Sequence, residues 1–142
     1  MAKNKVEEVM GCFGEYDCSQ AILSAWCEEY GLDKETALKL SCGFAGGMAR
    51  LGHTCGAVTG AYLVISLKYG KCQPGDVKAK EKTFELIQEF DKRFIEKNDT
   101  TNCRELLGVD LRYGDIQYAK EQVQKKCSGL VRDAAEILEA IL

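Results

Sequence analysis

Residues 54–70 read TCGAVTGAYLVISLKYG, and this stretch decides the fold that the sequence predicts. From about Cys55 to Tyr69 it forms the most apolar helical pattern of the chain, and Gly70 is a natural helix end. We therefore expect a central, buried helix. Its first turns are almost bare beside the thiol of Cys55, because small residues follow it at Gly56, Ala57, Gly60 and Ala61.

Helical periodicity also recurs upstream of this central helix. Asp17 and Gln20 form a capping-box pattern for a helix whose natural stop is Gly31. A short helix is expected from about residue 34 to residue 40. The segment 41–52, SCGFAGGMARLG, contains four glycines and predicts a loop or a broken helix.

Downstream, the pattern predicts helices over about 76–96, 115–125 and 128–142. A further short helix lies in the segment NDTTNCRELLG, where Asn102 and Glu105 form a second capping box. No convincing alternating strand is present. The sequence therefore predicts an all-α fold, an irregular helical bundle in a single domain over residues 1–142 with a central apolar Gly/Ala-rich helix.

Charge and composition exclude several classes of function. The chain has 142 residues, a net charge of −3 and a pI of about 5.3. No basic patch suggests nucleic acid or anionic lipid as a partner. The start MAKNKVEEVM has no secretory apolar region, and the longest apolar run, 57–67, is too short to span a bilayer. We expect a cytoplasmic protein without membrane insertion, and the sequence indicates no oligomeric state.

Cysteine is the unusual component. In a reducing compartment a cysteine-rich chain more often binds metal or performs redox chemistry than forms disulfides. No pair has the spacing CxxC, which excludes a thioredoxin motif, a zinc ribbon and a CxxCH haem site. A single histidine, His53, excludes a Cys2His2 zinc site. The eight cysteines are Cys12, Cys18, Cys27, Cys42, Cys55, Cys72, Cys103 and Cys127.

Four of these cysteines fall at or near predicted helix starts: Cys18, Cys55, Cys103 and Cys127. The free N–H groups and the positive end of a helix dipole stabilise a thiolate and lower the cysteine pKa. We predict that the four thiols converge as redox-active residues and as metal ligands. Cys42, in the glycine-rich segment, and Gly56 are predicted as further cofactor contacts. His53 is expected to be a bystander more often than a ligand.

The order Cys18, then CGAVTG from Cys55, then Cys103, then Cys127 resembles the family of redox-active proteins named for its C–GCAxxG–C–C pattern. The resemblance runs from Cys18 to the C-terminus and includes CRELLGVDL and CSGLVRDAAEILEAIL. It differs from the family name in that Thr54 precedes Cys55 and Gly56 precedes Ala57. The resemblance implies a small redox protein with four functional cysteines. A related domain in split-Soret-type cytochromes is associated with an iron–sulfur site.

Three functions agree with these features. The first is an electron carrier or oxidoreductase in which the four thiolates hold an iron–sulfur cluster or another soft metal, zinc or Cu(I), and exchange electrons with a protein partner. The second is a metal-free thiol–disulfide protein that uses Cys55 with Cys18, Cys103 or Cys127. The third is a helical interaction module whose cysteines only pack. We favour the first, because thiolate is a soft ligand and because of the cytochrome-associated relative.

Overall fold

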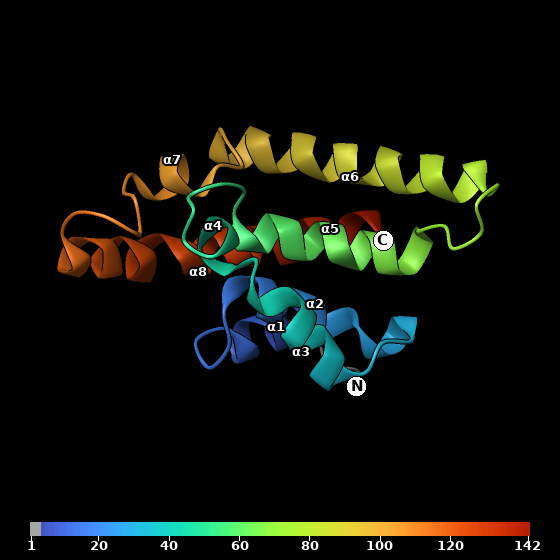
Figure 1. Ribbon diagram of the computed structural model, residues 1–142, viewed down its shortest axis with the longest axis horizontal. Helices are drawn as coiled ribbons and strands as arrows, with labels where there is room; N and C mark the ends of the chain where they lie inside the picture. The colour runs from blue at the N-terminus through green and yellow to red at the C-terminus, as the bar shows by residue number, and fades with distance from the viewer. Residues whose placement is uncertain (1–3) are drawn as a thin grey trace.

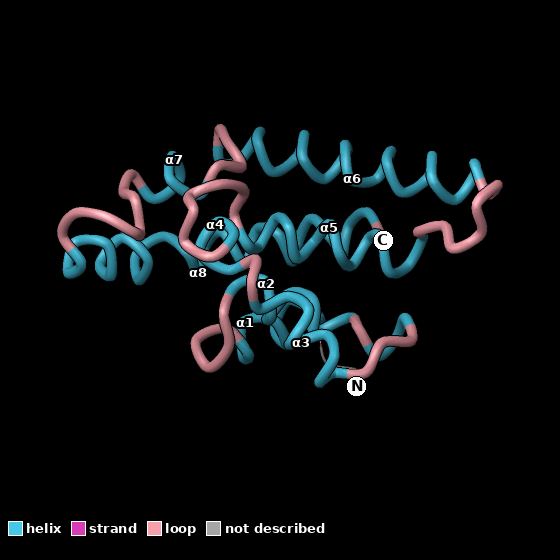
Figure 2. Tube along the Cα trace, in the orientation of Figure 1, coloured by secondary structure: helices cyan, strands magenta, loops and turns pink. Residues whose placement is uncertain are grey.

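The computed structural model describes residues 4–142, and its fold is all-α (Figures 1 and 2). Two isolated β-bridges, Phe13–Tyr16 and Thr54–Asn102, are the only extended pairings within these residues. The elements in chain order are α1 (Lys5–Cys12), α2 (Cys18–Trp26), the 3-10 helix η1 (Glu28–Tyr30), α3 (Lys34–Cys42), α4 (Ala45–Met48), α5 (Gly56–Tyr69), α6 (Val77–Asn98), α7 (Cys103–Leu107) and α8 (Ile116–Ile141).

Helix α5 lies at the centre, as the sequence predicts. Figure 1 shows it between α6 on one side and α2 with α3 on the other, and α8 runs behind it. Gly60 allows α2 to cross closely, since a Cβ there would stand 3.0 Å from the backbone oxygen of Ser19 and 3.1 Å from Cβ of Ile22. Gly60 therefore serves the packing of α5 against α2.

Most predicted helix starts are confirmed by their caps. Asp17 and Gln20 form the expected capping box on α2. Asn102 accepts a hydrogen bond from the Glu105 amide at 3.0 Å and caps α7. The predicted stripe of α6 is also buried, at Thr83, Leu86, Phe90 and Phe94.

Two expectations about helices are wrong. The predicted helices 115–125 and 128–142 form one continuous α8, and Cys127 lies inside it instead of near a helix start. The predicted break lies between residues 125 and 128, but buried residues on both sides, such as Gln122 and Leu130, hold the chain helical through it. Helix α1 was also not predicted; it packs against α2 and α8 and ends at Cys12.

The bundle has two distinct ends. At one end α5 finishes near the C-terminus, where Lys68 Nζ donates to the backbone oxygen of Leu142 at 3.0 Å. At the other end lie α4, α7 and the start of α5 (Figure 2). Within residues 4–142, none of the helices combines the length and the apolar character that crossing a membrane requires.

Candidate thiol site

A short β-bridge joins the segments that carry Cys55 and Cys103. Thr54 pairs with Asn102, the Cys55 amide donates to the Thr101 oxygen at 2.8 Å, and the Cys103 amide donates to the His53 oxygen at 2.6 Å. Cys55 is the N-cap of α5 and Cys103 is the first residue of α7. The bridge thus brings together two helix starts that are 48 positions apart in the numbering of the chain.

Cys18 reaches the same place from α2. A Cβ on Gly56 would overlap the Cys18 sulfur, and it would also stand 3.0 Å from the backbone oxygen of Phe44. The Gly46 amide donates to the Cys18 thiol. Position 56 therefore has no room for a side chain, because the Cys18 sulfur occupies the space beside Cys55.

Cys127 enters from α8, which packs against α7. Charge repulsion from Cys18 and Cys103 acts on the Cys127 thiol, and repulsion from the same two residues acts on Cys55. Because the Coulomb interaction weakens with distance, this coupling indicates that the thiols lie near one another. The four thiols therefore gather at one end of the bundle, and we call Cys18, Cys55, Cys103 and Cys127 the thiol site.

Burial governs the chemistry of these thiols. It raises the pKa of Cys103 to about 11 and that of Cys127 to about 12, and repulsion from neighbouring thiols adds to both shifts. It also raises the pKa of Cys18 and of Cys55. Amide groups of Gly46, at Cys18, and of Ala57 and Val58, at Cys55, oppose this shift but are outweighed. The prediction that helix starts lower the pKa of these thiols is therefore wrong for the metal-free protein.

The glycine-rich segment forms a wall over the thiol site. Five successive residues, 46–50, have φ between +53° and +70°, which is one turn of left-handed helix. Left-handed backbone costs a non-glycine residue about 1–2 kcal/mol, and Met48, Ala49 and Arg50 all adopt it. Gly47 presses against Cys103, because a Cβ there would stand 2.5 Å from Cys103 Cβ. Strain of this kind is found where a function requires it.

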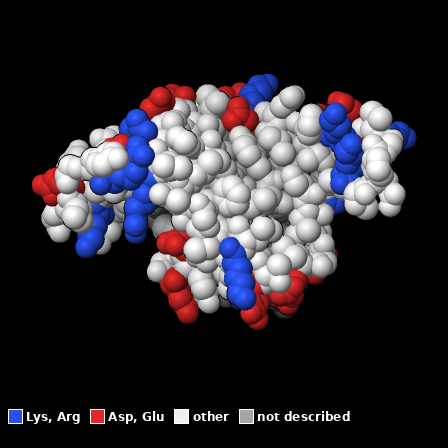
Figure 3. Space-filling model, viewed as in Figure 1, with Lys and Arg blue, Asp and Glu red and all other residues white. Residues whose placement is uncertain are grey.

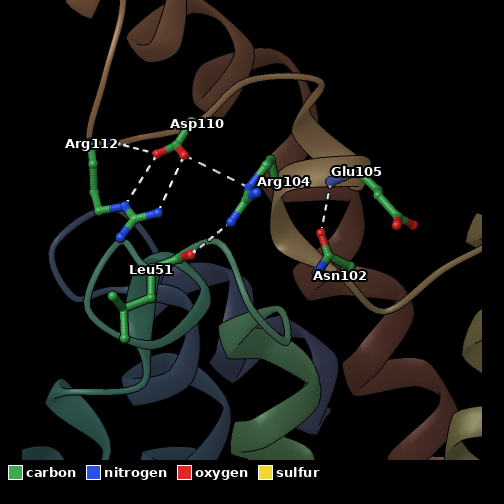
Figure 4. A network of polar contacts seen from close by, with 6 residues as sticks. All are labelled: Leu51, Asn102, Arg104, Glu105, Asp110 and Arg112. Carbon is green, nitrogen blue, oxygen red and sulfur yellow. Dashed lines mark hydrogen bonds and ion pairs between the residues drawn. The ribbon is translucent and has the colours of Figure 1, made fainter.

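Arg104 fastens this wall to α7 (Figure 4). Its guanidinium donates to the Leu51 oxygen at 3.2 Å and lies 3.8 Å from a carboxylate oxygen of Asp110. Arg112 contacts the other oxygen of Asp110 at 3.4 Å. Half of the Arg104 side chain is exposed, so these pairs contribute little stability individually. Their role is to hold the loop that leads into Cys55 beside the helix that begins at Cys103.

The other cysteines lie elsewhere. Cys27 is fully buried and its thiol contacts the Ser24 oxygen at 3.4 Å, which agrees with a packing role. Cys12 ends α1 and is half-buried, and Cys72 is exposed in a turn. Cys42 is the last residue of α3 and is exposed, so its cofactor contact stays a prediction. His53 is exposed, and its backbone makes the contacts that bear on the site.

Sequence reasoning found the four cysteines and Gly56 but missed what assembles them. The Thr54–Asn102 bridge, the Gly47 contact and the Arg104 clamp are all long-range, and one sequence carries no pairing signal for them. The nearest local signal was the small polar residue before Cys55 and before Cys103. Within residues 4–142, no three cysteine, histidine, aspartate or glutamate side chains stand close enough to enclose a metal ion.

A comparison with protein-family models matches residues 16–141 to the family described as "Putative redox-active protein (C_GCAxxG_C_C)". The chain belongs to this family. The match spans α2 to α8 and so contains all four cysteines of the thiol site together with its glycine wall. No curated protein and no solved structure matched the chain in the corresponding comparisons.

Proposed function

We propose that this member of the C_GCAxxG_C_C family is a cytoplasmic electron-transfer protein that holds an iron–sulfur cluster or another thiolate-bound metal at Cys18, Cys55, Cys103 and Cys127. The observation that carries the proposal is the gathering of four thiols from α2, α5, α7 and α8 at one end of the bundle. Family membership supports redox activity in general. An iron–sulfur cluster would supply reversible one-electron chemistry, whereas zinc, which has no redox activity, would not.

The residues present fit a soft, cationic group. All four donors are sulfur, and thiolate ligands select iron–sulfur clusters, zinc or Cu(I). Gly56 leaves the Cys18 sulfur beside Cys55, where any side chain would displace it. Four buried thiolates would repel one another strongly, and a bound cation offsets that repulsion and removes the protons.

The positions of the thiols along the chain argue against an ordinary zinc knuckle, because the four cysteines form no CxxC pair. They agree with a site assembled from four separate helices, α2, α5, α7 and α8.

The metal-free alternative has less support. An attacking cysteine needs a substantial thiolate fraction near neutral pH, and burial keeps all four thiols protonated there. The module with purely packing cysteines agrees with the burial of Cys27, Cys55 and Cys103 among the core side chains, but it gives no reason for four thiols to share one end of the bundle.

Anaerobic reconstitution tests the proposal. The protein would be reduced, incubated with ferrous iron and sulfide, desalted, and analysed for iron, acid-labile sulfide and visible absorbance. We expect brown protein that contains both elements, and we expect each single Cys→Ser variant of the thiol site to lose most of them.

Two cysteines outside the site provide controls. Cys72→Ser alters an exposed thiol in a turn and should bind as much iron and sulfide as the parent chain. Cys42→Ser tests the prediction of a cofactor contact there. A parent chain that stays free of iron and zinc but forms a reversible disulfide within the thiol site would contradict the proposal and favour the metal-free alternative.

A further inference from the structure

Basic side chains gather at the end of the molecule that contains the thiol site (Figure 3). Arg50 packs over Gly46, Arg104 packs over Gly52, and Lys126 donates to the Leu107 oxygen at the end of α7. Arg112 pairs with Asp110, shortly after α7. All four are exposed. We call Arg50, Arg104, Arg112 and Lys126 the basic rim.

Only one residue of backbone separates part of this rim from the thiols. The Gly46 amide donates to the Cys18 thiol. The Cγ atom of Arg50 lies 3.2 Å from the position that a Cβ on Gly46 would take. Arg104 directly follows Cys103 in α7. A protein bound over the basic rim would therefore lie close to the thiol site.

The rim keeps a net positive charge despite nearby carboxylates. Asp110 is shared by Arg104 and Arg112, so one carboxylate faces two guanidinium groups. The Glu105 side chain points away from these groups, and only its amide is bonded, to Asn102 (Figure 4). Arg50 and Lys126 form no ion pair with any residue from 4 to 142. This positive face is unusual on a chain whose net charge is −3.

We propose that the basic rim is the docking face for a small acidic electron-carrier protein. This inference rests on the proposed function, because only a redox group at the thiols gives an electron carrier a reason to bind there. Complementary charge steers such encounters and fixes their orientation, while contributing only moderate affinity. Transient redox complexes use small contact areas of this kind.

Binding would be measured with the full chain, reduced and metal-free, and an acidic plant-type [2Fe–2S] ferredoxin as the probe. Isothermal titration at low ionic strength should detect a complex that weakens steeply as salt is added. In the double variant Arg50→Glu/Arg112→Gln we expect the dissociation constant to rise about tenfold. Arg104 stays unchanged because it clamps the wall, and the Arg112→Gln change keeps the backbone N–H that donates to Asp110.

The matched control is Lys78→Glu/Lys82→Gln, which makes the same change of charge where α6 begins, at the opposite end of the bundle (Figure 1). Its dissociation constant should change by less than about twofold. Circular dichroism must show both variants folded like the parent chain.

Three results would overturn the docking face: no binding of the probe by the parent chain, equal weakening by both double variants, or binding of anionic phospholipid vesicles in place of the probe. Because the chain is metal-free in this experiment, failure of the iron and sulfide assay would leave the binding result standing. Loss of binding would likewise leave the assay unaffected.

Discussion

Replacing Gly56 by alanine tests how tightly the thiol site is built. The added Cβ would overlap the Cys18 sulfur and approach two backbone atoms, the Phe44 oxygen at 3.0 Å and Ala45 Cα at 3.2 Å. Cys18 begins α2 and the two backbone atoms belong to the start of α4, so the short Cys18 side chain is the only one of the three that can turn aside without moving backbone. Either α4 or the Cys18 thiol must shift.

The expected cost follows from the packing. Adding a methyl group to a close-packed site typically costs about 1–3 kcal/mol. The same change at Gly129, on the exposed side of α8, meets nothing within 4 Å and should stabilise the protein by about 0.5–1 kcal/mol, since alanine is the better helix former. The two variants therefore have opposite signs and differ by roughly 1.5–4 kcal/mol in free energy of unfolding.

Urea unfolding of the reduced, metal-free protein would measure both variants. With a slope of about 1–3 kcal/mol per molar urea, the two midpoints should differ by roughly 1 M. The displaced Cys18 thiol should also react faster with a disulfide reagent in Gly56→Ala than in the parent chain. If Gly56→Ala unfolds at the parent midpoint with unchanged thiol reactivity, the close approach of Cys18 to α5 is refuted.

Two further predictions concern the wall and the buried thiols. Ala49→Gly should raise the free energy of unfolding by about 1 kcal/mol, because Ala49 has φ +53° and glycine adopts left-handed backbone without a steric penalty. As a control, Ala79→Gly inside α6 should lower the free energy of unfolding by about 0.5–1 kcal/mol. Urea midpoints that fall for both variants would contradict the left-handed turn. The stability of the protein should also depend on pH, because folding raises the pKa of Cys103 to about 11 and that of Cys127 to about 12. An unfolded thiol deprotonates near pH 9, so this stabilising contribution is fully present below pH 9 and is lost as the pH rises through the folded pKa values. The urea midpoint of the metal-free protein should therefore fall between about pH 9 and pH 11, and the fall should be shallower in Cys103→Ser but unchanged in Cys72→Ser; equal curves for all three proteins would contradict the burial of Cys103.

Local signals in the sequence predicted the helices well. The Asp17–Gln20 box, the Asn102 cap and the apolar stripe ending at Phe94 each act within a few residues, so one sequence contains everything needed to interpret them. The same locality explains the error between residues 125 and 128. The local pattern predicts a break there, but burial of Leu130 and Val131 by the rest of the bundle outweighs that weak local preference.

The thiol site shows what local reasoning misses about cysteine. The sequence predicts that cysteines at helix starts have a lowered pKa, and amide donors are present at Cys18 and Cys55. The bridge and the glycine wall then bury those thiols beside one another, and desolvation with mutual repulsion outweighs the amides. The same amides become effective only when a cation offsets the charge of the sulfurs, because they can then stabilise thiolates that burial alone would keep protonated. The proposed metal group would supply that cation, and for this reason the buried thiols favour the proposal over the metal-free alternative.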